Sequence, residues 1–186
     1  MKGILFKPDM HKAIEEGRKT QTRRVIKELE EPDKWVFEPQ YGWFRQYKDD
    51  FSAFTLVIKP RYQVGEVLYI KEAWAVNPTY DDLKPSQIPH DAFVTYLNDR
   101  YNAMLIGKKR SPLFMPAWAA RYFIQITDVS SERLQDITEK DAIAEGVELG
   151  SARGHFSILW DSINPKYSWS SNPFVWVYGV KKAQHA

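Results

Sequence analysis

The stretch from Glu15 to Arg24, EEGRKTQTRR, gathers four cations, two threonines and a glutamine where a short helix is expected to end. If the chain is extended after Lys19, the side chains of Thr20, Thr22 and Arg24 point to one face, because side chains alternate along a strand. That face would offer two hydroxyls and a guanidinium beside an amine, which could hold an anion, a polar base edge or a reacting carbonyl. A strand edge that follows a helix end, where cations are favoured, accounts for the same residue types equally well.

The composition defines a broad class of protein. The 186 residues are 44% hydrophobic and 27% charged, which suits one soluble domain with a sizeable core. Aromatic residues make up 15%, enough either to stack on nucleobases or to fill a small β-rich core. A net charge of +2 does not indicate a duplex-binding protein. Local clusters of Lys and Arg are therefore more informative about nucleic-acid binding than the net charge. The run KKR at 108–110 could equally be a solvated face.

Several kinds of site are excluded or disfavoured by residue type. The chain has no cysteine, so disulfides, thiol catalysis and thiolate metal sites are excluded. The four histidines lack metal-ligand spacing, and we predict neither a metal nor a cofactor. The apolar run GILF near the N-terminus is far too short for a signal peptide or a spanning helix. The expectation is a cytoplasmic protein without a membrane partner.

Apolar patterning and turn signals predict many short strands and few helices. Strands are predicted for GILF, TQTRRVI, FTLVIKP, the stretch from Val67 to Trp74, RYFIQITDVSSERL and NPFVWVYGVKK, with KWVFEP and GWFRQY as a hairpin. Helices are predicted from Pro8 or Asp9 to Gly17, for DITEKDAIAEG with Thr138 as its N-cap, and for HFSILWDSI. The last would have one apolar face of Phe156, Leu159, Trp160 and Ile163. The proline-rich segment 77–112 is predicted to be a long loop with one strand-like piece, AFVTYL. These elements favour a strand-dominated α+β fold, with a small mixed β-barrel whose ends are covered by helices.

Six segments resemble the ASCH domain of the PUA-like superfamily, most closely its phage- and prophage-associated branch. They are ILF…M…AI…GRKTQTRRV, VGEVLYIKEAW, MPAWAARYFIQITDV, LQDITEKDAIAEGV, LWDSIN and NPFVWVYGV. The resemblance covers most of the chain in order and leaves out two insert-like regions near 28–58 and 77–110. It implies a single domain over 1–186: a PUA-like β-barrel with short flanking helices, long inserted loops and a cleft for RNA or a modified nucleoside.

The resemblance also implies catalytic residues. The family signature, Gly-x-Lys-x-x-Glu-x-Arg, is represented by Gly17, Lys19, Thr22 and Arg24, with threonine in place of the frequent glutamate. Small bacterial ASCH proteins that hydrolyse N4-acetylcytidine carry a similar KTxTxR run, in which the lysine and second threonine are catalytic. Their third catalytic residue, a glutamate in a TEKxAxxE segment, corresponds to Glu145. This chain is much longer than those hydrolases, so its inserts could reshape the site.

The three residues suit amide hydrolysis chemically. Thr22 would be the nucleophile, and a hydroxyl needs a nearby base. Lys19 could serve when neutral, but lowering its pKa from about 10.4 to about 7 requires roughly 4–5 kcal/mol. Burial and the neighbouring Arg24 would both act in that direction, whereas an ionised Glu145 would oppose it. Glu145 fits better as a proton shuttle to the leaving amine, and Arg24 as a group that stabilises the oxyanion.

The plainer interpretations stay open for each of these residues. Thr22 could be present for its β-propensity, Lys19 as a helix-end cation, and Glu145 as the exposed end of a short helix. Glu72 and Trp74 in KEAW fall where the family has a strand bordering the cleft, and Trp118 and Arg121 in MPAWAAR are placed similarly. With Thr20, these are candidate substrate- or RNA-binding residues. Trp74 could stack on a base or pack in the core.

Two classes of function follow from the resemblance, and the sequence leaves open whether the protein is an enzyme. The first is an amidohydrolase of an N4-acylated cytosine nucleoside, with Lys19, Thr22 and Glu145 converging in an enclosed pocket. The second is a non-catalytic RNA-binding module, or a metal-independent ribonuclease, with an open basic cleft bordered by aromatic side chains. A phage assembly role has no supporting segment. The expected partner is a modified nucleoside or RNA, and no obligate protein partner is predicted.

Overall fold

The computed structural model describes residues 1–27, 29, 35–38, 42–47, 54–99, 106–147 and 150–184. The chain divides into two compact units. The first comprises Met1–Glu15, Val67–Gln125 and Lys182–Ala186, and the second comprises Glu16–Glu66 and Ile126–Lys181. The region near 77–110 that resembles an insert belongs to the first unit, and the region near 28–58 belongs to the second. The single ASCH-like domain over 1–186 stays a prediction.

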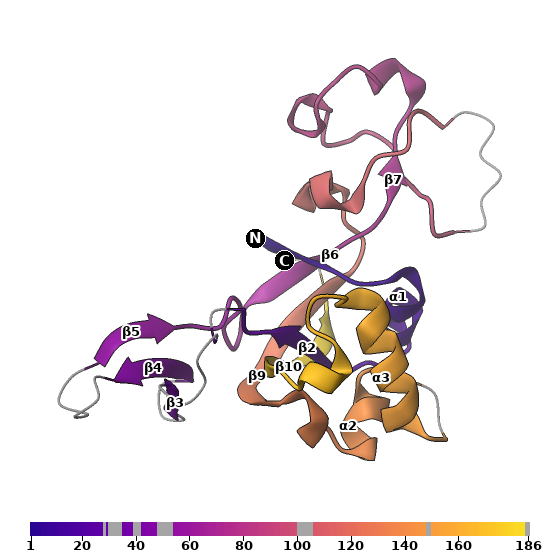
Figure 1. Ribbon diagram of the computed structural model, residues 1–186. Coiled ribbons are helices and arrows are strands. Elements are labelled where there is room, and N and C mark those ends of the chain that lie inside the picture. The colour runs from indigo at the N-terminus through magenta and orange to yellow at the C-terminus, as the bar shows by residue number, and fades with distance from the viewer. Residues whose placement is uncertain are drawn as a thin grey trace. The chain divides into compact units, whose positions relative to one another are not determined.

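The first unit is built on a short parallel strand pair. Strand β1 (Lys2–Leu5) pairs in parallel with β6 (Val67–Lys71), so that Ile4 lies opposite Ile70. Strand β6 also pairs antiparallel with the first residues of β9 (Phe123–Arg133). Helix α1 (Pro8–Glu15) follows β1 and begins at the predicted proline, whose fixed φ suits a first helical position (Figure 1). The pairing of β1 confirms the predicted strand GILF, and α1 confirms the predicted first helix.

The strand predicted from Val67 to Trp74 is interrupted. It ends as β6 at Lys71 and resumes as β7 (Trp74–Ala75), which pairs with the short β8 (Thr95–Tyr96). The interruption falls at Glu72, whose backbone N–H donates to the sulfur of Met115 in place of a strand neighbour. Beyond β7, the described part of 77–112 is mostly loop, as the prolines predicted. It also contains short 3-10 helices, which were not predicted, at Pro78–Tyr80, Pro85–Gln87 and Pro112–Phe114.

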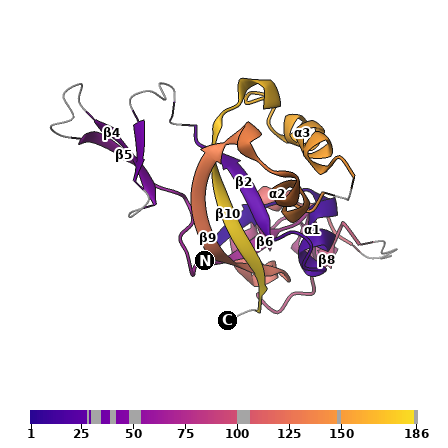
Figure 2. The ribbon, with the colours of Figure 1, turned by 90° about the horizontal axis from the view of Figure 1, so that it is seen from below.

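The second unit contains an antiparallel strand trio. Strand β10 (Phe174–Ala183) lies between β9 and β2 (Gln21–Val25), and Tyr178 lies opposite Thr22 (Figure 2). A separate antiparallel sheet holds β3 (Trp35–Glu38), β4 (Trp43–Tyr47) and β5 (Phe54–Ile58). The predicted aromatic hairpin is confirmed, because β3 pairs with β4 and sets Phe37 opposite Phe44.

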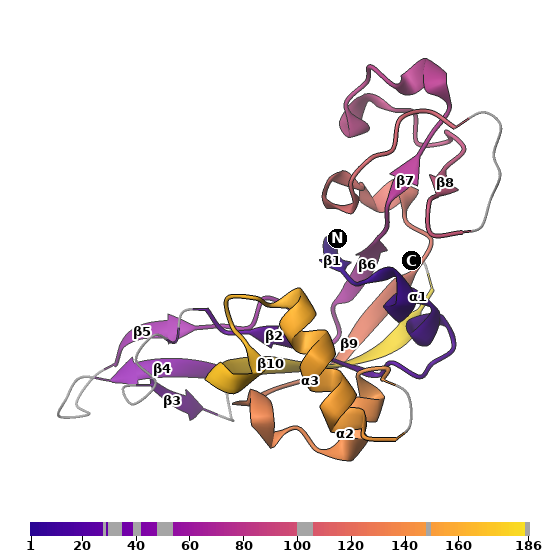
Figure 3. The same ribbon diagram turned by 45° about the vertical axis from the view of Figure 1, so that its right-hand side comes forward.

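Two helices cover one face of this trio. Helices α2 (Glu139–Ala144) and α3 (Ala152–Ile163) lie side by side (Figure 3). Their buried residues form one apolar cluster with the strand residues Val175 and Val177. Phe156 and Trp160 are buried there as predicted, but the prediction for Ile163 is wrong. Ile163 is 37% exposed, because the helix ends at this residue and Asn164 is its C-cap.

The sheets and short helices confirm the predicted α+β class. The predicted closed barrel is not seen among the strands of the described ranges, where β1 and β2 each pair on one side only. Alternation of apolar residues predicts strands, but closure depends on strand tilt and stagger, which alternation does not encode. Within the same ranges, no helix is long and apolar enough to cross a membrane.

Candidate active site

The segment before β2 is tied to two other elements of the second unit. Gly17 has a φ of +73°, the left-handed conformation that glycine adopts easily after a helix. Thr20 then donates its backbone N–H to Ala144 O (2.8 Å) and accepts from Val180 N (2.8 Å). These bonds fix Lys19 between the end of α2 and strand β10.

Helix α2 places Glu145 at the same point. The predicted N-cap is confirmed, because Thr138 Oγ1 accepts from Asp141 N (3.1 Å). At the other end Glu145 is the C-cap, and the next residue, Gly146, turns the chain with a φ of +90°. Glu145 is only 3% exposed, so it is not the solvated helix end that its position in the sequence allows.

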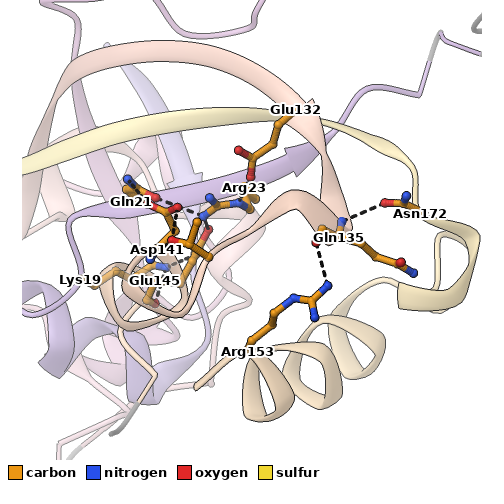
Figure 4. A network of polar contacts seen from close by, with 10 residues as sticks. Lys19, Gln21, Arg23, Glu132, Gln135, Asp141, Glu145, Arg153 and Asn172 are labelled. Carbon is orange, nitrogen blue, oxygen red and sulfur yellow. Dashed lines mark hydrogen bonds and ion pairs between the residues drawn. The ribbon is translucent and has the colours of Figure 1, made fainter. Parts of the chain in front are cut away.

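Lys19 and Glu145 form a buried ion pair, although they are 126 residues apart in the chain. Lys19 Nζ donates to Glu145 Oε2 (2.6 Å) and to Glu145 O (2.7 Å). The other carboxylate oxygen, Oε1, accepts from Arg23 Nη1 (3.1 Å), and Arg23 Nε donates to Glu132 Oε1 (2.7 Å) (Figure 4). Lys19 is 2% exposed, so the pair lies away from solvent.

Burial changes the acid–base behaviour of Lys19. Desolvation lowers the pKa of its ammonium, and the positive charges of Arg24 and Arg23 act in the same direction. Glu145 raises it through charge and hydrogen bonding, but the net result is a pKa below the ordinary value. The site therefore favours the neutral amine more than water does, which is what a general base requires.

Strand β2 presents two different faces. Gln21 and Arg23 face helix α2, where Gln21 Nε2 donates to Asp141 Oδ1 (3.2 Å). Thr22 lies on the other face, buried at 3% exposure and opposite Tyr178. The half-buried Arg24 shares the face of Thr22 by alternation, and burial lowers the pKa of its guanidinium. The structure thus brings Lys19 and Glu145 into contact, and the catalytic roles of Lys19, Thr22 and Glu145 stay predictions.

The remaining predicted residues lie in the first unit, where Glu72 and Arg121 belong to a second polar cluster. Arg121 donates twice to the carboxylate of Glu72 (2.9 Å each) and twice to that of Asp99 (2.7 and 2.8 Å). Nδ1 of the buried His11 lies 3.4 Å from Glu72 Oε1. Because its hydrogen bonds and charge are directed to carboxylates, Arg121 holds the cluster together in this structure.

The two tryptophans of the first unit pack on protein side chains. Trp74 is fully buried, and its ring meets Trp118 edge to face at 6.0 Å. Trp118 also stacks on His90, with ring centroids 5.4 Å apart and an interplanar angle of 18°. Of the two, only Trp118 is partly exposed, so it alone could meet a base without repacking of the core.

Arg23 and Glu132 are site residues that the sequence did not reveal. The sequence drew attention to Thr20, Thr22 and Arg24. Arg23 lies on the opposite face of the strand, because side chains alternate. Its second partner, Glu132, is an ordinary charged residue near the end of β9. Among the described residues, no group of His, Asp or Glu is arranged to hold a metal ion.

The sequence matches no protein-family model and no curated protein. A solved structure of an Enterococcus faecalis V583 protein, assigned to the family DUF984, is similar with a TM-score of 0.45 and 10% identity. The similarity covers 94% of this chain and 67% of that one. An ASCH domain from Lactobacillus crispatus JV V101 is similar with a TM-score of 0.40 and 12% identity, over 94% of this chain and 70% of that one. Inference about function therefore rests on the side chains.

Proposed function

We propose that the protein is an ASCH-type amidohydrolase, of the phage- and prophage-associated branch, that removes the acyl group from an N4-acylated cytosine nucleoside. The observation that carries the proposal is the buried contact between Lys19 and Glu145, which come from distant parts of the chain. An ion pair out of water costs desolvation energy on both sides, and hydrophobic replacements of such pairs are often as stable. A buried lysine with a lowered pKa beside a carboxylate is therefore a candidate for acid–base chemistry.

The proposed reaction proceeds in two steps. In the first, the Thr22 hydroxyl attacks the acyl carbonyl, and neutral Lys19 takes the hydroxyl proton. The amide C–N bond then breaks, and Glu145 passes a proton from Lys19 to the departing N4 of cytosine along their 2.6 Å hydrogen bond. In the second, Lys19 takes a proton from a water molecule that attacks the ester on Thr22, the C–O bond to Thr22 breaks, and Lys19 returns the proton to the Thr22 oxygen as the carboxylic acid is released.

Two arginines have supporting roles in this proposal. Arg23 holds Glu145 Oε1 while Lys19 holds Oε2, so the carboxylate keeps one orientation. Arg24 interacts electrostatically with both Lys19 and Glu145, and it shares the strand face of Thr22. The Lys19 amine is bonded to Glu145 and also interacts electrostatically with Arg24, the neighbour of Thr22 along that strand face. Arg24 would face the developing oxyanion or another anionic group of the substrate.

The test is release of cytidine from N4-acetylcytidine by wild type and by Thr22→Val, which keeps the shape of the side chain and removes the nucleophile. We expect turnover by wild type and a loss of about 10²-fold or more in the variant. Thr127→Val, an exposed strand threonine of the same unit, is the matched control and should retain full activity. Absence of turnover by wild type would refute the proposal and direct attention to salt-dependent RNA binding instead.

A further inference from the structure

A chain of hydrogen bonds links Glu132 on β9 to the Lys19–Glu145 pair. Arg23 forms its middle: Nε donates to Glu132 Oε1 (2.7 Å), and Nη1 donates to Glu145 Oε1 (3.1 Å). The same Nη1 also donates to Gln21 Oε1 (3.2 Å). Figure 4 shows Arg23 between the two carboxylates. Glu132 takes no part in the proposed proton transfers, so any effect that it has on them must pass through Arg23.

The donors of Arg23 are divided among different acceptors. A guanidinium has one N–H on Nε and two on each of its other nitrogens. The Nε donor binds Glu132, and the two Nη1 donors match the oxygens of Glu145 and Gln21. Arg23 bonds to Oε1 of Glu145, whereas Lys19 Nζ bonds to Oε2 at 2.6 Å. Arg23 therefore holds the carboxylate by one oxygen, and the other oxygen faces the lysine.

Burial makes this division dependent on Glu132. The side chain of Arg23 is 1% exposed, and that of Glu132 is 27% exposed. A buried charged donor that loses its acceptor is costly, so Arg23 without Glu132 would turn to another. Arginine pairs most strongly with a carboxylate through two parallel N–H bonds. The carboxylate that Arg23 already contacts is that of Glu145, where a second bond would compete with Lys19 for Oε2.

We propose that Glu132 is a positioning residue for the Lys19–Glu145 pair. By binding Nε of Arg23, it limits Arg23 to one oxygen of Glu145 and keeps the other oxygen for Lys19. The proton that passes between Lys19 and Glu145 then follows one path, along the bond to Oε2. This inference rests on the proposed deacylase function, and it names a residue that supports the same site through another side chain.

Two consequences of losing Glu132 have opposite signs for Lys19. If Arg23 moves onto Oε2, Lys19 loses part of the interaction with Glu145 that raises its pKa, and the charge of Arg23 comes closer. Both changes lower the pKa of Lys19 further. If the packing only loosens, water reaches Lys19 and its pKa rises toward the ordinary value, because desolvation is the main cause that lowers it. The direction of the change therefore separates positioning from a merely structural role.

The test compares wild type with Glu132→Ala, Glu132→Gln and Asp128→Ala. Glutamine keeps an oxygen that can accept from Arg23 Nε, and Asp128 is an exposed carboxylate of the same strand. With N4-acetylcytidine as substrate, we expect Glu132→Ala to lower kcat about tenfold at unchanged KM, the size of one charged hydrogen bond. Glu132→Gln should restore most of kcat, and Asp128→Ala should match wild type. Equal loss of kcat in Glu132→Ala and Glu132→Gln would overturn the positioning role.

A second readout needs no substrate. The titration of Lys19 is followed by NMR in protein that carries 15N-labelled lysine, and Lys19→Met identifies its signal. We expect a lower pKa of Lys19 in Glu132→Ala than in wild type, Glu132→Gln and Asp128→Ala. An unchanged or higher pKa in Glu132→Ala would overturn the inference. Glu132→Val, which suits a strand, replaces Glu132→Ala if circular dichroism shows that the latter is unfolded.

The two readouts separate this inference from the function on which it rests. If wild type does not hydrolyse N4-acetylcytidine, the deacylase function fails, and the titration alone decides whether Glu132 positions the pair. If wild type hydrolyses the substrate and neither kcat nor the pKa of Lys19 changes in Glu132→Ala, the deacylase stands and the positioning role is overturned.

Discussion

Replacing Lys19 by methionine is expected to lower the rate of N4-acetylcytidine hydrolysis by about 10²- to 10⁴-fold, the contribution typical of a general base. Methionine retains most of the aliphatic volume of lysine but cannot accept the proton of Thr22. Lys27→Met, the same substitution at an exposed lysine after β2, is the matched control. Steady-state kinetics on both variants, with circular dichroism to establish that each is folded, provides the measurement. Unchanged kcat/KM in Lys19→Met would contradict the assignment.

The pH profile of the wild type gives a second readout of Lys19. The base is the neutral amine, so the rate should rise with pH as the ammonium loses its proton and level off above its pKa. Because burial lowers the pKa of Lys19, this rise should lie below the ordinary value of 10.5. A rate that falls with increasing pH over the same range would exclude Lys19 as the base.

Replacing Arg121 by methionine is expected to destabilise the protein by about 3 kcal/mol, the lower end of the cost of breaking a buried ion pair. The Glu72 side chain is fully buried and would lose two hydrogen bonds to its carboxylate. The Arg121 side chain is 26% exposed, which argues for the lower end of the range. Chemical denaturation of wild type and variant measures the difference. A loss below about 1 kcal/mol, as for an exposed pair, would contradict it.

The effect of Arg121→Met should depend on pH. Burial raises the pKa of Glu72, but hydrogen bonds with His11 and Arg121 outweigh it and hold the pKa below its ordinary value. A carboxylate with a depressed folded-state pKa stabilises the fold above its unfolded pKa of about 4.3, and this stability is lost as pH falls. The variant should therefore differ most from wild type near neutral pH and least in acid. The double variant Glu72→Leu, Arg121→Met should lose less than Arg121→Met alone, because no buried charge is left unpaired.

Local signals in the sequence predicted most of the elements. Thr138 marks the start of α2 because its hydroxyl can cap the helix, and the aromatic run around Gly42 predicts the hairpin of β3 and β4. The break at Glu72 was missed, because it depends on Met115, which lies 43 residues away in the chain. Long-range contacts of this kind leave no periodic pattern.

The candidate site, like the fold, could be predicted only in part. Resemblance to a family, and no physical pattern, suggested that Lys19 and Glu145 belong together, and the structure places them in contact. Neither the resemblance nor the sequence pattern indicated that Arg23 contacts Glu145, because this contact depends on which face of β2 is covered by α2. The sequence left open whether Trp74 packs in the core or stacks on a base, because a tryptophan suits both, and the structure buries it.

The most direct test of the central claim is detection of an acyl group on Thr22. Wild type is mixed with N4-acetylcytidine, quenched rapidly and analysed by mass spectrometry of the peptide that contains residues 19–23. We predict an acetyl ester on Thr22 that forms as cytidine is released and is absent from Thr22→Val. Release of cytidine by Thr22→Val at the wild-type rate, with no acetylated peptide in the wild type, would contradict a threonine nucleophile at this site.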